Sequence, residues 1–253
     1  MCSSDLSAAN ALTYTYWGEG KVKSLTDSVN GRSYSYGYDT RGRLTSAEEK
    51  YGSTTVRTWQ AWYDTADRPT QVSYWLHPDW SATQNDERRY CWEYSSADGS
   101  LTKYTFPTNF SNTWLTYEYD ALKRLSRRSL TAAGGLQRTR EYTYLPGSGT
   151  DGTTTMVGGL TIRNGSGVQK AAFSYTYDSV GNITGITGGL GENPTGSESY
   201  TYDTQDRLTQ AVIDGVTYTY TYDAGGNIIS KSDGNTIDSY TYADSEWKDL
   251  LTA

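Results

Sequence analysis

Polar and apolar side chains alternate strictly in parts of this chain. From Thr217 to Tyr222, threonine and tyrosine alternate over six residues. Successive side chains of a β-strand point to opposite faces of the sheet, so this period of two predicts a strand with tyrosine on one face and threonine on the other. No stretch keeps a helical period for longer than a turn or two. The pattern therefore predicts an all-β fold.

A nine-residue pattern, Tyr-x-Tyr-Asp-x-x-Gly-polar-apolar, occurs at Tyr220–Ile228 and recurs along the chain. Close copies lie at Tyr36–Leu44, Tyr117–Leu125, Tyr175–Ile183 and Tyr200–Leu208, and a more divergent copy lies at Tyr63–Arg68. We select as the signature of the repeat Tyr36, Tyr38, Asp39, Gly42, Tyr117, Tyr119, Asp120, Tyr175, Tyr177, Asp178, Gly181, Tyr200, Tyr202, Asp203, Tyr220, Tyr222, Asp223 and Gly226. Five good copies in one chain make a chance match very unlikely, so the pattern marks a tandem repeat.

The chemistry of the pattern is that of a β-hairpin. The two tyrosines lie on one face of a strand, and the aspartate takes the first position of a type I turn, where its carboxylate accepts a backbone N–H two residues on. Glycine three residues after the aspartate then supplies the left-handed conformation of a G1 bulge. Asp39 with Gly42, Asp178 with Gly181 and Asp223 with Gly226 have this spacing. The apolar residue at the end of each copy returns the chain to a buried face: Leu44, Leu125, Ile183, Leu208 and Ile228.

A second turn signal lies between the copies. Asn30-Gly31 and Asp214-Gly215 precede Asp39 and Asp223 by the same offset, and both dipeptides favour a type I′ hairpin. Each repeat unit is thus strand, tight turn, strand, tight turn, with a length of about 20 to 25 residues. We expect tandem β-hairpins that form one long antiparallel sheet.

The repeat sets the expected domain organisation. Residues 14–253 are expected to hold about ten units in a single repeat domain, cut at both ends, after a non-repeat start at residues 1–13. Within that start, Met1–Leu6 resembles a translated sequencing adapter and is expected to be an artefact of assembly.

Composition narrows the functional classes. The chain has 253 residues, a formal net charge of −7, 24 Tyr and 8 Trp, and only 35% hydrophobic residues. The acidic balance argues against a nucleic-acid partner, and no apolar run approaches the roughly 20 residues needed to span a bilayer. Burial has to come largely from tyrosine and tryptophan, which suit sheets because they combine a large apolar ring with a polar group.

The sequence offers no convincing catalytic, cofactor or metal site. There are two cysteines and one histidine, His77, which lies in a predicted turn. Gly147-x-Gly149-x-x-Gly152 matches a dinucleotide fingerprint in form, but no helix start follows it, so we interpret it as a flexible turn. The turn aspartates are better explained by turn closure than by calcium binding.

Two clusters allow two interpretations each. The stretch from Ala121 to Arg140 carries basic residues and no acid; it is either a solvated hairpin face or a patch for an acidic partner. Five tryptophans, Trp59, Trp62, Trp75, Trp80 and Trp92, either fill the core or form a platform on which sugars stack.

The stretch Tyr36–Thr45 and its sibling ending Gly181-Asn182-Ile183-Thr184 resemble the YD repeats of bacterial RHS proteins and the related teneurin-like shell. The resemblance covers about Tyr14 to the end, and the tail Tyr240–Thr252 is similar to a segment that leads towards the RHS-associated core. Three positions depart from the aspartate of the pattern, and one departs from its apolar return residue: Trp17, Leu145, Ala243 and Pro69.

The resemblance implies a long antiparallel sheet that curves and spirals into a hollow shell around a C-terminal toxin or effector. It therefore implies a scaffold without catalytic residues, in a polymorphic toxin or a wall-associated protein that is secreted or lies at the cell surface. The implied partners are the neighbouring repeats and the enclosed effector of the same polypeptide. The alternative is a cell-surface adhesion module that binds carbohydrate through its tryptophans. An enzyme is the weakest interpretation, because no acid, base and nucleophile set is evident.

Overall fold

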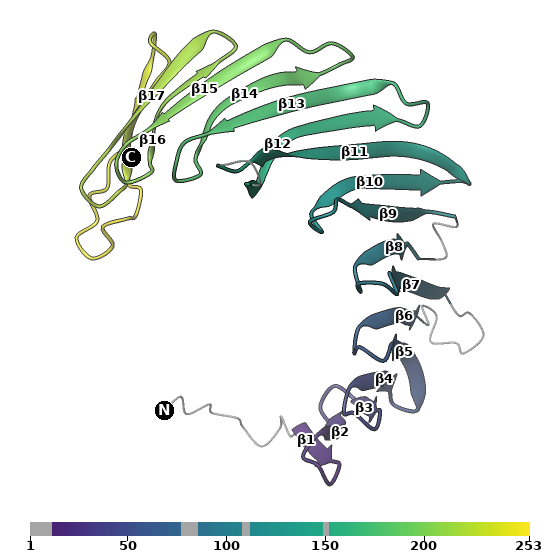
Figure 1. The fold of residues 1–253 in the computed structure, drawn as a ribbon. Coiled ribbons are helices and arrows are strands. Elements are labelled where there is room, and N and C mark those ends of the chain that lie inside the picture. The colour runs from purple at the N-terminus through teal and green to yellow at the C-terminus, as the bar shows by residue number, and fades with distance from the viewer. Residues whose placement is uncertain (1–11, 77–85, 108–111, 149–151) are drawn as a thin grey trace. The chain divides into compact units, whose positions relative to one another are not determined.

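The fold consists of strands and turns. The computed structural model describes residues 12–76, 86–107, 112–148 and 152–253, and these residues contain no helix. They form nineteen strands that belong to one sheet (Figure 1). The predicted all-β fold is confirmed.

The chain divides into two compact parts, which we call the N-terminal part (Met1–Tyr117 and Leu130–Gly135) and the C-terminal part (Glu118–Ser129 and Leu136–Ala253). The strands of the N-terminal part are β1 (Leu12–Tyr16), β2 (Val22–Asp27), β3 (Arg32–Tyr38), β4 (Leu44–Tyr51), β5 (Thr54–Tyr63), β6 (Pro69–Leu76), β7 (Asp86–Tyr94), β8 (Leu101–Thr105) and most of β9 (Trp114–Tyr119). Residues of β10 (Leu125–Ala132) belong to both parts. The C-terminal part continues with β11 (Gly135–Pro146), β12 (Thr153–Asn164), β13 (Gln169–Tyr177), β14 (Ile183–Leu190), β15 (Gly196–Tyr202), β16 (Leu208–Ile213), β17 (Val216–Tyr222), β18 (Ile228–Ser232) and β19 (Ile237–Ser239).

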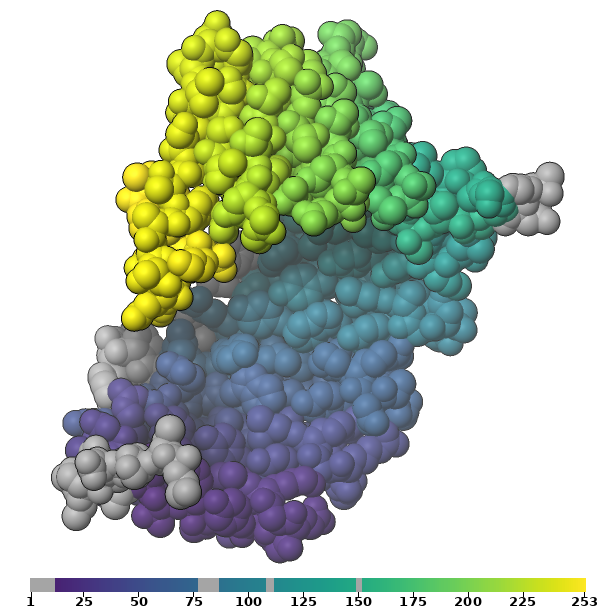
Figure 2. Space-filling view, turned by 90° about the vertical axis from the view of Figure 1, so that its left-hand side faces the viewer, coloured from purple at the N-terminus to yellow at the C-terminus, as the bar shows by residue number. Residues whose placement is uncertain are grey.

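Each part is an antiparallel meander. From β1 to β9 every strand pairs with the next one in the sequence, and the same holds from β11 to β19. In the space-filling view, the strands of the C-terminal part lie side by side, and their colour changes gradually from green to yellow (Figure 2). Sequence neighbours are therefore spatial neighbours, as expected for tandem hairpins.

The alternation along the strands sorts the side chains onto two faces. In β17 the three tyrosines are half-buried and the three threonines are exposed, as predicted. The face that carries the tyrosines of the repeat is called the tyrosine face below. The opposite face is rich in serine and threonine, for example Thr219 opposite Ser232 and Thr221 opposite Ser230.

A β-bulge accompanies five of the repeat turns. In the first good copy Gly37 pairs with Ser46, whereas Tyr38 pairs with Leu44, so Thr45 has no opposite residue. The register shifts in the same way next to Tyr63, Tyr177, Tyr202 and Tyr222. Such a bulge increases the local twist of the strands.

The sheet buries few residues completely. The buried apolar residues are Ala61, Ala171 and Ala211, and the residues with less than 2% exposure and the largest volume are Thr139 and Ser73. These small residues are buried because larger neighbours on the same face cover them. The larger neighbours themselves remain partly exposed to solvent. The five apolar return residues, from Leu44 to Ile228, are likewise half-buried.

One turn prediction is confirmed and one is wrong. Asp214 and Gly215 have φ of 52° and 80° between the paired residues Ile213 and Val216, as a type I′ hairpin requires. The loop at Asn30-Gly31 instead has four residues between the paired Asp27 and Arg32, and only Gly31 is left-handed. The Asp27 carboxylate accepts the N–H groups of residues 29 and 30, both at 3.1 Å, and thereby holds a longer loop.

Candidate functional site

The aspartate of each repeat closes its own turn. Asp39 Oδ1 accepts the backbone N–H groups of Arg41 at 2.9 Å and Arg43 at 3.0 Å, and its carbonyl accepts the N–H of Gly42 at 2.9 Å. The Arg43 N–H, followed by the Arg43 side chain, holds the pKa of Asp39 below its usual value. This is the turn that the sequence predicts, and it recurs at Asp64, Asp120, Asp178, Asp203 and Asp223.

The third residue after the aspartate is left-handed in every one of these turns. Gly42, Gly181 and Gly226 have φ of 79°, 104° and 93°, which confirms their predicted conformation. Copies without glycine keep the same backbone at the cost of an unfavourable φ: Asp67 (64°), Lys123 (65°) and Asp206 (59°). The turn geometry is therefore imposed by the whole hairpin and not by glycine alone.

The polar residue after the turn binds back to the aspartate. Arg43 Nε donates to Asp39 Oδ2 at 2.6 Å, and Arg68, Arg124 and Arg207 make the same bond to Asp64, Asp120 and Asp203. Where asparagine replaces arginine, its Nδ2 donates instead, at 3.0 Å in both Asn182 and Asn227. The signature aspartate thus fixes both the turn and the side chain that follows it.

The same arginine reaches the next repeat unit. Arg43 Nη1 donates to the Asp64 carbonyl at 3.2 Å and to Asp67 Oδ1 at 2.6 Å, and its guanidinium lies 4.6 Å from the centre of the Tyr63 ring. Three further arginines repeat this arrangement over the second tyrosine of the next unit, in the pairs Arg68–Tyr94, Arg124–Tyr144 and Arg207–Tyr222. Sequence reasoning missed this contact, since only the recurrence of arginine at one position could have indicated it.

The second tyrosine completes the contact from the other side. Its hydroxyl donates to the carbonyl of the return residue in the preceding unit, at 2.8 to 3.0 Å, in Tyr63, Tyr94, Tyr144, Tyr177, Tyr202 and Tyr222. Pro69 departs from the apolar return position, yet its carbonyl accepts the Tyr94 hydroxyl. We call each such set of tyrosine, arginine or asparagine, and carbonyl contacts a joint.

The first tyrosines of the signature lie on the same face and take no part in the joints that these bonds define. Burial raises the pKa of Tyr36 and of Tyr175. For Tyr200, burial and the hydrogen bond that its hydroxyl donates to Glu198 raise the pKa to about 12. Tyr36, Tyr175 and Tyr200 therefore stay neutral, and their amphipathic rings pack on this face.

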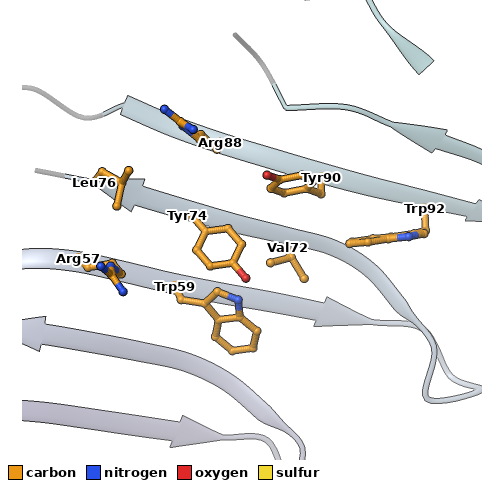
Figure 3. Close-up of a pocket in the computed structure, with 8 residues that line it drawn as sticks. All are labelled: Arg57, Trp59, Val72, Tyr74, Leu76, Arg88, Tyr90 and Trp92. Atoms are coloured by element: carbon orange, nitrogen blue, oxygen red, sulfur yellow. The ribbon is translucent and has the colours of Figure 1, made fainter. Parts of the chain in front are cut away.

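The tyrosine face carries an open hollow of about 510 Å³ in the N-terminal part (Figure 3). Its lining comes from three neighbouring strands, β5, β6 and β7: Arg57, Trp59, Val72, Tyr74, Leu76, Arg88, Tyr90 and Trp92. Trp59 lies opposite Tyr74 and Tyr74 lies opposite Arg88 in the strand register, which places them on one face. The guanidinium groups of Arg57 and Arg88 lie at the end near Leu76, and the rings fill the rest (Figure 3).

The tryptophans divide between the two faces. Trp59 and Trp92 line the hollow. Trp62 lies three residues from Trp59 on the same strand, and Trp75 lies opposite Thr58, so both point to the serine- and threonine-rich face. Trp62 is 41% exposed, and none of these four is buried. They do not fill a closed core. Trp80 and His77 lie outside the described residues.

The basic stretch is partly neutralised. Arg124 is held by Asp120, and Arg127 lies 3.8 Å from both Glu118 and Glu141. Glu141 also pairs with Arg163 at 3.2 Å. Two of the basic side chains, Arg124 and Arg127, are thus paired with carboxylates within the sheet.

Within the described residues, no group of three or more His, Cys, Asp or Glu side chains is placed to hold a metal ion. The described residues also contain no helix that is long and apolar enough to cross a membrane. The glycine-rich turn lies between β11 and β12, where the Gly147 N–H donates to the Gly152 carbonyl at 2.8 Å; residues 149–151 lie outside the described part.

Comparison with known proteins adds two family matches. The RHS Repeat model matches residues 16–55, and the Teneurin YD-shell model matches residues 160–247. The tRNA nuclease WapA of Bacillus subtilis (strain 168) is 31% identical over 86 residues, which are 33% of this chain and 4% of that protein. The chain thus spans a small share of that relative.

Two solved structures are also similar. The Tc holotoxin pore of Photorhabdus luminescens with the mutation TccC3-D651A aligns over 97% of this chain and 16% of that chain, with 17% identity and a TM-score of 0.43. A porin-like protein from Bacteroides uniformis aligns over 82% of this chain and 81% of that chain, with 14% identity and a TM-score of 0.36. The two family matches show that this chain carries RHS and YD-shell repeats.

Proposed function

We propose that this chain is a segment of an RHS/YD shell wall that encloses, and helps to deliver, a toxin or effector of the same polypeptide outside these residues. The observation that carries the proposal is the joint, which links each hairpin to the next through side chains on one face. Successive hairpins fixed in this way form a continuous wall, since each unit contacts only its neighbours. The name of the family model that matches residues 160–247, Teneurin YD-shell, agrees with such a wall.

A scaffold role also agrees with the chemistry of the signature. Its aspartates are bound by turn N–H groups and by arginine or asparagine, and its second tyrosines donate to carbonyls. Side chains committed in this way are not available as nucleophile or base. The match to the Bacillus nuclease covers only 4% of that protein and gives no support for nuclease activity in this chain. We propose that the shell lies outside the cell or at its surface, because an effector that is delivered to another cell has to leave the cell that makes it.

The test is native proteolysis of the complete reading frame that contains this chain. We expect trypsin to spare a segment outside the repeats as long as the sheet is folded, and to cleave it once denaturant opens the joints. The double variant Tyr202→Phe/Arg207→Gln, which weakens two neighbouring joints, should expose that segment at a lower denaturant concentration. Equal cleavage rates of every segment in native and denatured protein would overturn the proposal.

A further inference from the structure

Three arginines of the C-terminal part have no carboxylate beside them. They are Arg128 on β10 and Arg138 and Arg140 on β11, and we call them the arginine patch. Among the described residues, no ion pair, hydrogen bond or ring contact of their guanidinium groups is seen. Arg138 is exposed, and Arg128 and Arg140 are half-buried.

Strand register places the two arginines of β11 on the tyrosine face. Tyr142 lies opposite Leu160, and Leu160 lies opposite Phe173. Phe173 shares a face with the signature tyrosine Tyr175, which follows two residues later on β13. Tyr142 therefore lies on the tyrosine face. The arginines two and four residues before it lie on the same face, because the register of β11 is regular over these positions.

Arg128 reaches the same face from the neighbouring strand. Arg127 Nε lies 3.8 Å from Glu141 Oε1. Glu141 directly precedes Tyr142, so this ion pair lies on the opposite, serine- and threonine-rich face. Arg128 follows Arg127 on β10 and thus points to the tyrosine face, on the strand next to that of Arg140. The patch therefore brings like charges together on two neighbouring strands.

The pairing of arginine differs between the two faces. The other arginines of the C-terminal part all pair with carboxylates: Arg124 with Asp120, Arg127 with Glu118 and Glu141, Arg163 with Glu141, and Arg207 with Asp203. On the tyrosine face, the residues of β12 opposite Arg138 and Arg140 are Asn164 and Ile162, which carry no charge. Partial burial of a guanidinium without a partner is unfavourable. The arrangement is suited to a ligand that supplies the missing negative charge.

The layout of the patch favours an extended acidic segment over a small anion. One exposed pair of arginine and carboxylate contributes little to binding, whereas several pairs on one ligand act together. Arg138 and Arg140 are two residues apart on one strand, so their Cβ atoms repeat at roughly 6.4 to 6.8 Å. Carboxylates at alternate positions of an extended polypeptide repeat at the same interval, and the guanidinium fork matches the carboxylate geometry.

We propose that the arginine patch binds an extended polypeptide segment that carries Asp or Glu at alternate positions. The inference deepens the proposed function and rests on it in one respect: the enclosed effector would supply the segment, and the tyrosine face would be the face that meets it. A nucleic acid fits less well, because a chain with a net charge of −7 repels a long polyanion. A short segment interacts mainly with charges within the Debye length of about 8 to 10 Å.

The experiment measures fluorescence anisotropy of a labelled synthetic peptide, in which glutamate and serine alternate, added to the full chain. We expect saturable binding that weakens as salt rises, and no binding of the peptide with glutamine in place of glutamate. Arg128→Gln/Arg140→Gln should weaken binding about fivefold or more, because two of the three charges are lost. The matched control is Arg127→Gln/Arg163→Gln, which removes the same charge from the opposite face and should weaken binding less than about twofold.

Circular dichroism and thermal melting of each variant establish that it is folded. Arg138→Gln is the second test, because this side chain is exposed and its loss leaves the packing of the sheet unchanged; it should weaken binding more than the control does. Absence of saturable binding, or equal weakening by the patch variants and the control, would overturn the proposal.

A single-stranded oligothymidylate is tested in parallel by competition. If it displaces the peptide and binds more tightly, the patch belongs to a nucleic acid and the proposal is overturned. The protease test described above does not depend on these arginines, so failure of one proposal is distinguishable from failure of the other.

Discussion

The Tyr202 hydroxyl donates to the carbonyl oxygen of Ile183 at 2.8 Å, across the boundary between two repeat units. The donor is the second tyrosine of its unit and the acceptor is the return residue of the preceding unit. Because six tyrosines make this bond to the corresponding residue, the relation is a rule of the repeat. It explains why the signature requires tyrosine, and not phenylalanine, at this position.

Tyr202→Phe tests the contribution of one joint. The change keeps the ring and removes the hydroxyl, so we expect a loss of about 1 kcal/mol in the free energy of unfolding, measured by urea denaturation. Tyr220→Phe is the control and should change stability by less. Tyr220 is also half-buried, but no hydrogen bond of its hydroxyl is seen among the described residues. Equal midpoints for parent and Tyr202→Phe would contradict the role of the bond.

Gly181→Ala tests the left-handed turn. Gly181 has φ of 104°, and an added Cβ would meet nothing within 4 Å, so the penalty comes from the backbone alone. We expect a loss of about 1 kcal/mol, read from the denaturant midpoint. Gly18→Ala, at a turn glycine that is not left-handed and has equal space, should be neutral or slightly stabilising. Similar effects of the two changes would contradict the assignment.

Arg43→Lys tests the arginine of a joint. Lysine keeps the charge but cannot hold Asp39, Asp67 and the Tyr63 ring at once, so we expect a loss of about 1 to 2 kcal/mol. A double-mutant cycle with Tyr63→Leu should show a coupling of about 0.5 to 1 kcal/mol. Arg89→Lys, whose carboxylate partner is two residues away on the same strand, should cost less. A coupling energy of zero would contradict a stabilising contact between Arg43 and the Tyr63 ring.

The turn aspartates predict how stability depends on pH. Hydrogen bonds from Arg43 to Asp39, from Arg68 to Asp64, from Arg207 to Asp203 and from Asn227 to Asp223 hold the pKa of each carboxyl below its usual value. A pKa that is lower in the folded state stabilises the protein above the unfolded value of about 3.9, and this contribution is lost as the pH falls through the folded pKa. We therefore expect the urea midpoint to fall progressively below about pH 4.

Asp39→Asn separates this effect from general acid unfolding. Asparagine still accepts the turn N–H groups but does not titrate, so the variant should be less stable at pH 7 and its midpoint should depend less on pH. Asp249→Asn is the control for removal of one negative charge, because no hydrogen bond to the Asp249 carboxylate is seen among the described residues, and it should change the stability at pH 7 less than Asp39→Asn does. An unchanged slope in Asp39→Asn would show that the turn carboxylate is not responsible.

Much of a single hairpin could be predicted from the sequence, because its causes are local. The spacing of Asp178 and Gly181 specifies a turn, and the alternation from Thr217 to Tyr222 specifies two faces. The loop at Asn30 was mispredicted because a carboxylate outside the dipeptide, that of Asp27, captures two N–H groups. Lys123 is left-handed without being glycine, and only its alignment with Gly42 in the repeat indicates this conformation.

The joints and the hollow could not be predicted, because they depend on residues far apart in the sequence, 14 to 25 positions for the tyrosine–carbonyl bonds. Which arginine atom reaches which carbonyl follows from the register of two hairpins, and no local pattern encodes it. Trp59 and Trp62 belong to one tryptophan-rich stretch of the sequence, yet strand register places them on opposite faces. Only the structure shows that Arg57 and Arg88 lie beside the same rings.

The acceptors in the joints have an evolutionary consequence. The tyrosine hydroxyl binds a main-chain carbonyl, a group that every amino acid possesses, and Pro69 provides it as well as leucine does. A unit can therefore be duplicated, deleted or exchanged by recombination as a whole, because the neighbours on either side of the cut present interchangeable surfaces. Selection has to preserve only a few positions per unit, which leaves the other side chains of each hairpin free to diverge.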